Sequence, residues 1–413
     1  MTQGEEEAHP TEPRDPVPLF IPLLLIFASV TSILSTDLYT PSLPHLVDIF
    51  DSDAMTVQLT MTLNLAGFAI AQLFYGPLSE RVGRRPVILC AMVAFGLASL
   101  ACALAFSIES LIIARTFQGL TACAEAVIGY AVVRELYGET GAVKVLAAYG
   151  MAIAVAPAVG PVIGGQMHVW FGWRSNFFLM TGLIVVACYF LWRHLPETLA
   201  RPDPRAIDPR RMMSGYLSLL RNPRYMAYCG LTAITFSGLF AFITAAPFLY
   251  ITTLQVPTER YGYYYAGIIV AYFLGSLLVN RLAGRFSIDA MVFWGLVFCA
   301  LGGLSLWILI AGQQQTPTTV TVAVSLYAFG LGLVLATAPI RAFDVGGAGY
   351  GFAAALLGAL EMGGGSLGAL AVGLMHDGSA RPIAWVLAAS AIGALLLYAV
   401  VRPWRQALPS NPG

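Results

Sequence analysis

Ile33-Leu34-Ser35-Thr36-Asp37-Leu38-Tyr39-Thr40-Pro41 closes the first long apolar segment of the chain, which runs from Leu19 to Tyr39. An apolar run of about 20 residues is long enough to cross a membrane. An acid at the centre of such a helix costs roughly 2.5 to 3.5 kcal/mol, so it usually faces a polar cavity, pairs with a cation or carries protons. This segment alone leaves two interpretations of Asp37 open: the proton carrier of a transporter, or an acid that reaches the membrane interface.

The composition of the whole chain is that of a membrane protein. Of its 413 residues, 58% are hydrophobic and only 11% are charged, whereas about 25% of the residues in a soluble domain are charged. Such a chain cannot cover a water-facing surface, so its main solvent must be lipid. The 22 basic and 22 acidic residues balance. Net charge therefore gives no sign of a nucleic-acid partner, and we expect none.

Twelve apolar segments are long enough to span a bilayer, so the expected fold class is an all-α membrane protein with two halves of six helices. The segments are approximately 18–40, 54–76, 86–106, 109–136, 142–167, 175–194, 225–252, 260–281, 288–311, 317–340, 348–375 and 381–402. A polar, proline-rich stretch separates the two sets of six. The expected organisation is a disordered tail at 1–17, an N-terminal half at 18–194, a linker at 195–224, a C-terminal half at 225–402 and a tail at 403–413.

The basic residues predict the orientation. If the N-terminus is cytoplasmic, the outer loops hold only Arg174, Arg260 and Arg381, and the other basic residues outside the spans fall on the inner side. This bias follows the positive-inside rule, so both termini and the linker should be cytoplasmic. A weak repeat supports two related halves. It pairs Gly76-Pro-Leu-Ser-Glu-Arg after span two with Asn280-Arg-Leu-Ala-Gly-Arg after span eight.

The inner loop after span two reads Gly76-Pro77-Leu78-Ser79-Glu80-Arg81-Val82-Gly83-Arg84-Arg85-Pro86. Its glycines allow a tight turn, and Glu80 among three arginines can form a charge network at the membrane surface. A network that forms in one conformation only sets the balance between two states. A solvated basic anchor would explain the arginines but not the glycine spacing. The expected conformational switch comprises Gly76, Glu80, Arg81, Gly83, Arg84, Arg85 and Arg134.

Spans four and five carry two further patterns. At helical spacing, Arg115, Gln118 and Glu125 share one broad face, which should line a cavity rather than face lipid. A structural ion pair between helices is the alternative. Span five contains Pro157-Ala158-Val159-Gly160-Pro161-Val162-Ile163-Gly164, where prolines kink the helix and small residues permit close contact. Such a helix suits a gate, although packing alone also explains the kink. We add Pro157, Gly160, Pro161 and Gly164 to the switch.

These three patterns, in this order, resemble the major facilitator superfamily. The inner loop is similar to the family's signature between helices two and three. The stretch 115–119 is similar to its basic motif in helix four, and the proline-glycine run of span five is similar to its antiporter motif. The stretches 35–44, 72–78, 236–250 and 261–264 look like the Bcr/CflA drug-resistance transporters. The resemblance covers nearly all of the chain outside the tails.

The resemblance implies proton-coupled export of small antimicrobials of the bicyclomycin, chloramphenicol and sulfonamide kind from a bacterial inner membrane. It places Asp37 in the central cavity and matches Arg115 to the helix-four arginine. Glu80 and Glu135 stand where relatives more often have Asp, and Ser29 stands where some relatives carry a second acid. Glu125 and Glu361 lie where relatives usually have small or uncharged residues. They are candidate extra proton or cation sites, or they pair quietly with Arg115 or with hydroxyl groups.

The expected mechanism needs protons, a small-molecule drug and a lipid bilayer, but no metal or other cofactor. A proton from outside neutralises Asp37 and releases the drug, and the membrane potential adds about 2.3 kcal/mol per charge for each 100 mV. No nucleotide-binding signature occurs, so ATP is not expected. We expect a monomer. The predicted binding wall comprises Asp37, Tyr39, Asn64, Arg115, Gln118, Glu125, Phe236, Phe240, Tyr264 and Glu361, although aromatic residues at helical spacing also serve packing.

Two other functions remain open from the sequence. A proton-coupled importer or metabolite exporter shares the architecture, and the proline-glycine run argues only against import. A membrane-embedded enzyme or receptor is the third possibility. An enzyme would need clustered catalytic residues, and the five histidines are scattered through tails, loops and span ends. The six cysteines lack the spacing of metal ligands, so we expect no metal site and no enzyme.

Overall fold

The computed structural model describes residues 20–346 and 350–401, so the predicted tails at 1–17 and 403–413 lie outside the described residues. The N-terminal half contains α1 (Phe20–Asp37), a 3-10 turn (Thr40–Ser42), α2 (Leu43–Ile49), α3 (Ala54–Val82), α4 (Arg84–Ala103), α5 (Ile108–Phe171) and α6 (Arg174–His194). The linker contains α7 (Pro209–Leu220). The C-terminal half contains α8 (Pro223–Pro247), a π-helical turn (Phe248–Thr253), α9 (Thr258–Leu282), α10 (Ile288–Ala311), α11 (Pro317–Gly346), α12 (Tyr350–Leu374) and α13 (Arg381–Val401).

Twelve helical segments of the described chain are long and apolar enough to cross a membrane, which confirms the predicted number and order. The long helix α5 supplies two of them, Ile108–Gly138 and Lys144–Phe171. Gly138 breaks the helix between them with φ 63°, a conformation that glycine adopts without the steric cost of a Cβ atom. Hydropathy therefore predicted the two spans correctly, although no loop of ordinary length separates them.

The helix starts follow local capping chemistry. The Asp53 side chain accepts a hydrogen bond from the Thr56 amide (2.9 Å) at the start of α3. Ser107 and Ser110 form a reciprocal capping box at the start of α5. Such caps satisfy amide groups that a helix leaves unpaired at its first turn.

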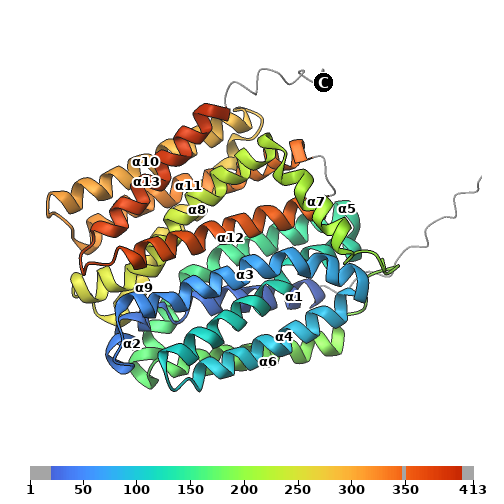
Figure 1. Ribbon diagram of the computed structural model, residues 1–413, viewed down its shortest axis with the longest axis horizontal. Coiled ribbons are helices and arrows are strands. Elements are labelled where there is room, and N and C mark those ends of the chain that lie inside the picture. The colour runs from blue at the N-terminus through green and yellow to red at the C-terminus, as the bar shows by residue number, and fades with distance from the viewer. Residues whose placement is uncertain (1–19, 347–349, 402–413) are drawn as a thin grey trace, which may run out of the picture.

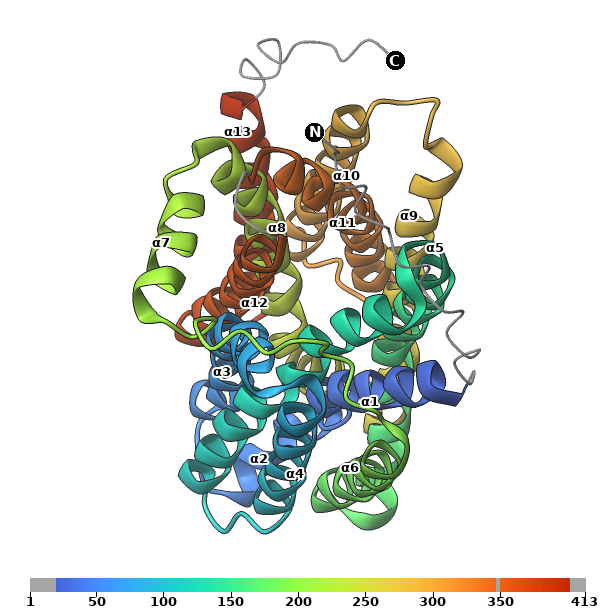
Figure 2. The same ribbon diagram turned by 90° about the vertical axis from the view of Figure 1, so that its right-hand side faces the viewer.

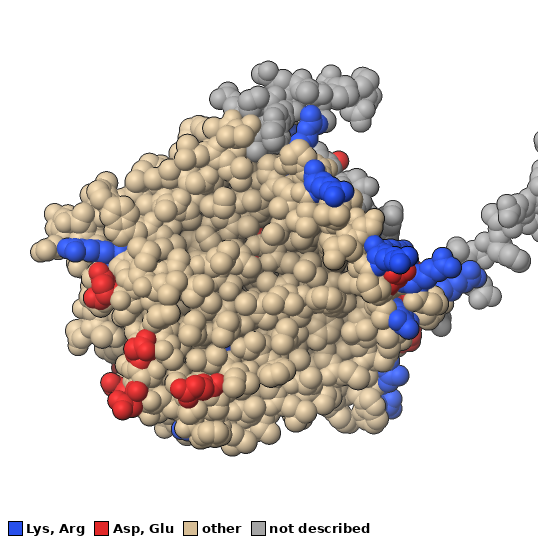
Figure 3. Space-filling model, in the orientation of Figure 1, with Lys and Arg blue, Asp and Glu red and all other residues tan. Residues whose placement is uncertain are grey.

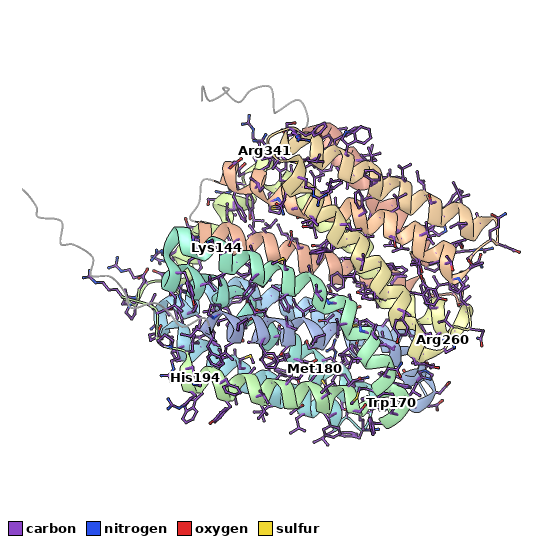
Figure 4. The ribbon with its side chains drawn as sticks, turned by 180° about the vertical axis from the view of Figure 1, so that it is seen from behind. Lys144, Trp170, Met180, His194, Arg260 and Arg341 are labelled. Carbon is purple, nitrogen blue, oxygen red and sulfur yellow. The ribbon has the colours of Figure 1, made fainter. Side chains whose placement is uncertain are left out.

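The two ends of the molecule differ in charge. Figure 3 shows most Lys and Arg side chains of this face at one end, which we call the basic end, and most Asp and Glu side chains at the opposite end. By the order of the helices, the basic end holds Arg81, Arg193, Arg281 and Arg341, and the opposite end holds Asp51 and Glu109. Figure 4 shows Lys144 and Arg341 toward one end and Trp170 and Arg260 toward the other. The side surface between the ends is apolar, and exposed residues there include Leu97, Ile113, Val185, Ile308 and Leu396. This surface has the character expected of a lipid-facing one.

The halves meet along two pairs of helices. Helix α3 lies beside α12 (Figure 1), and the second span of α5 packs against α9. At the acidic end, one apolar core runs through both halves and includes Leu43, Trp173, Tyr261 and Val320. At the basic end the cores are separate: one in the N-terminal half around Ile88 and Val132, and two in the C-terminal half, around Leu219 and Val292 and around Val279 and Leu333. Leu73 of α3 packs against the edge of the core around Leu219. The halves are thus joined at the acidic end and divided at the basic end.

Candidate functional site

A central cavity of about 710 Å³ lies between the halves. Helices α1, α3 and α5 form one wall, and α8, α9, α11 and α12 form the other. The cavity extends to Leu146 near the start of the second α5 span and to Asn280 near the end of α9, so it opens toward the basic end. Its volume is in the range of pockets that hold drug-sized molecules.

Asp37 is the only Asp, Glu, Lys, Arg or His among the described residues that line this cavity. It is the last residue of α1 and only 5% exposed. The Tyr265 hydroxyl of the opposite half donates a hydrogen bond to Oδ1 of Asp37 at 3.3 Å. The Asp37 Cβ also lies against Gly160 of α5, where a Cβ atom on the glycine would come within 3.0 Å. The carboxyl group therefore sits where both halves and the kinked helix meet.

Close backbone contacts seal the cavity on the acidic side. A Cβ atom on Gly164 would collide with the Leu38 carbonyl oxygen, and one on Gly262 of α9 would collide with the backbone of Val162. Beyond these contacts, His45 Nε2 and Thr258 Oγ1 share a hydrogen bond of 2.9 Å across the halves. The small residues of the predicted span-five motif thus lie where α5 approaches α1 and α9 most closely.

Arg115, in contrast, lies inside the N-terminal half and is completely buried. Its guanidinium group donates to the Ser35 carbonyl at 2.8 Å and to the Gln118 side chain, and it stacks on the Tyr39 ring with 4.3 Å to the ring centre. Asn64 donates to the Arg115 backbone carbonyl at 2.8 Å. The structure therefore gathers Tyr39, Asn64, Arg115 and Gln118 behind the cavity wall, whereas the sequence predicted them on it.

Glu125 also lies away from the cavity lining, on the first span of α5 where it faces α1 and the second span, and is 1% exposed. Its carboxylate accepts hydrogen bonds from the hydroxyl groups of Ser29 and Tyr149, the latter at 2.8 Å. Glu361 is half-buried on α12, beside Thr232 of α8 and Tyr272 of α9. Glu361 is not among the lining residues, although its neighbour Met362 is. The three candidate acids thus occupy three separate places.

The aromatic part of the cavity wall differs in detail from the prediction. Phe236 and Phe240 line the cavity as expected, with ring centres 5.0 Å apart. Tyr264 instead packs on Tyr250, 5.6 Å between centres, and the lining tyrosines of α9 are Tyr265 and Tyr272. These two are seven residues apart and share one helix face with Ile269. That spacing was a signal in the sequence that could have selected Tyr265 over its neighbour.

The inner loop forms a polar network at the basic end. Gly83 has φ 115° and separates the end of α3 from the start of α4. Arg84 forms an ion pair with Glu135 (2.9 Å) and donates to the Ser79 hydroxyl (2.5 Å), so its acidic partner on α5 is Glu135, whereas Glu80 is exposed. Arg81 is exposed, whereas Arg85 donates a hydrogen bond to the Trp192 carbonyl at 2.8 Å. Arg134 lines a groove of about 770 Å³, together with Gly76 and Glu80.

Glu197, which the sequence analysis did not single out, completes this network. Its carboxylate accepts hydrogen bonds from the amides of Arg84 (2.9 Å) and Arg85 (3.1 Å), the first residues of α4. The amides of Thr198 and Leu199 add two more at 3.0 Å. Partial burial would raise the pKa of Glu197, but these amide donors outweigh it and hold the pKa below its ordinary value of 4.5. The residue therefore ties the linker to the start of α4 as an anion.

Comparisons with known proteins agree with this architecture. Residues 25–369 match the family model described as Major Facilitator Superfamily. The chain is 32% identical to the multidrug transporter MdfA of Yersinia pestis bv. Antiqua (strain Angola) over 279 residues, 67% of this chain and 68% of the relative. It is 30% identical to MdfA of Escherichia coli O157:H7 over 279 residues, 67% of each chain.

Solved structures show the same fold at low sequence identity. The xylose transporter XylE from E. coli, in a partially occluded inward open conformation, has a TM-score of 0.73, 14% identity and coverage of 94% of this chain and 97% of that one. A bacterial homologue of the human lysosomal transporter Spinster has a TM-score of 0.71, 15% identity and coverage of 97% and 100%. With the family match over most of its length, this chain belongs to the Major Facilitator Superfamily and is a transporter rather than an enzyme.

Proposed function

We propose that this transporter exports small amphipathic antimicrobials in exchange for protons, with Asp37 as the group that proton and drug share. The observation that carries the proposal is the position of Asp37, buried in an aromatic cavity that is open at the basic end and sealed at the other. The relatives named multidrug transporters support the direction and the substrate class. The basic end is then the cytoplasmic end of a bacterial inner-membrane protein.

The cavity chemistry supports a cationic or neutral aromatic substrate. Phe236, Phe240 and Tyr272 offer ring faces, and a cation above a ring gains about 0.5 to 2 kcal/mol depending on its desolvation. Asp37 supplies the single negative charge, and no arginine or lysine lies among the described lining residues. A lipophilic monocation or an uncharged drug such as chloramphenicol fits this lining better than an anion does.

The coupling step follows from the contacts of α1. A proton that reaches Asp37 from the acidic end removes the negative charge, weakens the attraction for a cationic drug and lets the drug leave. Arg115 holds the α1 backbone at Ser35, two residues before Asp37, so a displacement of α1 moves the carboxyl group and the buried arginine together. Glu125 and Glu361 are further candidate proton sites in this proposal, and the predicted switch residues at both ends set the balance of states.

Transport by inside-out membrane vesicles tests the direction. When the vesicle interior is acidified, an exporter accumulates a lipophilic cation or chloramphenicol in the interior, whereas a proton-coupled importer releases a preloaded substrate. We expect accumulation that collapses when a protonophore is added and is lost in Asp37→Asn. Release of preloaded drug on acidification, or no gradient-driven movement of either compound, would contradict the proposal.

A further inference from the structure

The linker helix α7 carries a hydrogen bond that joins the two halves. The Tyr216 hydroxyl donates to the backbone carbonyl of Leu73 in α3 at 2.7 Å. Figure 2 shows α7 beside α12, at the side of the molecule where the linker crosses from α6. Leu73 belongs to the N-terminal half, whereas α7 is packed on the C-terminal half, so this bond spans the division at the basic end.

The Leu73 carbonyl needs this partner because of Pro77. In a helix, the carbonyl of residue 73 accepts from the amide of residue 77. Pro77 lies inside α3 and has no amide hydrogen, so that bond cannot form. The hydrogen bond lies in a partly buried place, where a carbonyl without a donor is unfavourable. The Tyr216 hydroxyl thus occupies an acceptor that the sequence of α3 itself leaves open.

The attachment of α7 to the C-terminal half is apolar and continuous. The Tyr216 ring meets the Phe352 ring of α12 edge to face, with centres 5.1 Å apart. Gly215 also lies against Phe352, where a Cβ atom would come within 3.2 Å. Leu219 is completely buried in the core of the C-terminal half. Helix α7 therefore moves with α12, and Leu73 moves with α3.

We propose that Tyr216 is a latch that stabilises the conformation open at the basic end by capping the carbonyl that Pro77 leaves without a donor. Closing the cavity at this end requires the halves to move relative to each other, and that movement displaces Leu73 from the Tyr216 hydroxyl. The bond then contributes to one state and not to the other, which is the condition for shifting a conformational equilibrium. The latch acts without substrate or protons and does not depend on the proposed export function.

Distance measurements between spin labels test the latch in the full chain. In a background without native cysteines, labels go to Lys144→Cys and Arg285→Cys, which are exposed at the basic end of the N- and C-terminal halves respectively. Tyr216→Phe keeps the ring on Phe352 and removes only the hydroxyl. We expect it to lower the ratio of the open to the closed population by about fivefold, the effect of losing one hydrogen bond of ordinary net strength.

Pro77→Ala distinguishes a latch from a merely structural tyrosine. It restores the amide hydrogen, so the Leu73 carbonyl is satisfied in either state, and Tyr216→Phe in this background should shift the ratio by less than about twofold. Tyr225→Phe is the matched control, because its hydroxyl donates to the Ala353 carbonyl (2.6 Å) within the C-terminal half. It should lower thermal stability and leave the ratio unchanged. An unchanged ratio in Tyr216→Phe, or equal shifts in both backgrounds, would overturn the proposal.

Discussion

Arg115 shows how a single residue organises the N-terminal half. A buried guanidinium group is costly unless hydrogen bonds and neighbouring polar or aromatic groups compensate for its lost hydration. Here Ser35 and Gln118 accept hydrogen bonds from Nη1, and the Tyr39 ring lies beneath the group, whereas Nε is buried without a hydrogen-bond partner among the described residues. The planar fork of arginine suits several fixed acceptors at once, which the point charge of lysine does not.

We therefore predict that Arg115→Lys lowers the free energy of unfolding in detergent by about 2 kcal/mol, the value of a charged hydrogen bond that is lost. Arg174→Lys is the matched control, because Arg174 also lies over an aromatic ring, Trp173, at 4.4 Å but is exposed. The control should cost less than about 1 kcal/mol. Equal losses in a denaturant titration of both variants would contradict this account of Arg115.

Glu197 gives a prediction for pH. Its pKa is lower in the folded protein than the ordinary 4.5, since amide groups favour its charged form. The stabilisation is present above the unfolded pKa and disappears as the pH falls through the folded value. Glu197→Gln should therefore melt at a lower temperature than wild type at pH 7, and the difference should shrink below about pH 4.5.

Glu80→Gln is the control for this measurement, because Glu80 is an exposed acid at the same end of the molecule. The melting temperature of Glu80→Gln should equal that of the wild type at each pH. A Glu197→Gln difference that stays constant down to acidic pH would show that the carboxylate charge has no part in holding the linker.

Charge and helical spacing predicted some of the cavity residues but not all of them. Phe236 and Phe240 were predicted from helical spacing, and Asp37 from its charge in an apolar span together with the family resemblance; all three line the cavity. Helical spacing gives a shared face but not its direction, so Arg115 and Gln118 were placed on the wall although their face turns into the N-terminal half. Glu197 lies in an apparently polar linker, and no local pattern shows that its carboxylate reaches the start of α4.

Helix α5 is the element on which the seal depends. Gly160 lies against Asp37 of α1 and Gly165 against Thr258 of α9, and Gly164 faces the Leu38 carbonyl with no room for a methyl group. Overpacking of this kind costs about 1 to 3 kcal/mol and pushes the helices apart. Small residues in a membrane helix thus allow a close approach that larger side chains would prevent.

We predict that Gly164→Ala lowers the unfolding free energy by about 1 to 3 kcal/mol and slows transport, because the acidic end can no longer close completely. Gly182→Ala in α6 is the control, since a Cβ atom there meets nothing within 4 Å. That change should leave stability the same or raise it by up to about 1 kcal/mol. A Gly164→Ala protein as stable and active as wild type would exclude the tight seal.

The helical elements were predictable because length and hydropathy determine what can cross a bilayer. The ends of the helices were less predictable. Helix α3, for example, continues through Pro77 to Val82, beyond the expected end at residue 76. Helix α7 was not predicted, because the proline-rich composition of the linker hides its start. Asp208 accepts from the Arg210 amide at 2.9 Å, and Pro209 takes the first helical position, where it needs no amide hydrogen.

The whole molecule is organised by the contrast between a core shared by both halves at the acidic end and separate cores in the two halves at the basic end. The sequence predicted two related halves and the sidedness of the charges. Which end is open could not be predicted, because alternative states of one sequence differ only by a few kcal/mol. Contacts such as that between Gly262 and Val162 exist only once the halves are assembled.

Because the cavity is open at the basic end, cysteines at the two ends should differ in their rates of chemical labelling. In a cysteine-free background, Asn280→Cys at the exposed mouth should react quickly with a water-soluble maleimide in the absence of substrate. Thr258→Cys, 8% exposed behind the seal, should react at least tenfold more slowly, a contrast expected from the difference in water access. Comparable rates at the two positions would show that the described conformation is not the main one in solution.

Proton release on drug binding shows whether the drug and the coupling proton share Asp37. Purified protein in weakly buffered detergent solution receives a lipophilic cation or chloramphenicol while a pH indicator records released protons. The account predicts release from wild type, no release from Asp37→Asn, and retained release from Phe240→Leu with weaker drug binding, because that change alters the wall but not the acid. Undiminished release from Asp37→Asn would contradict the account and move the coupling proton to Glu125 or Glu361.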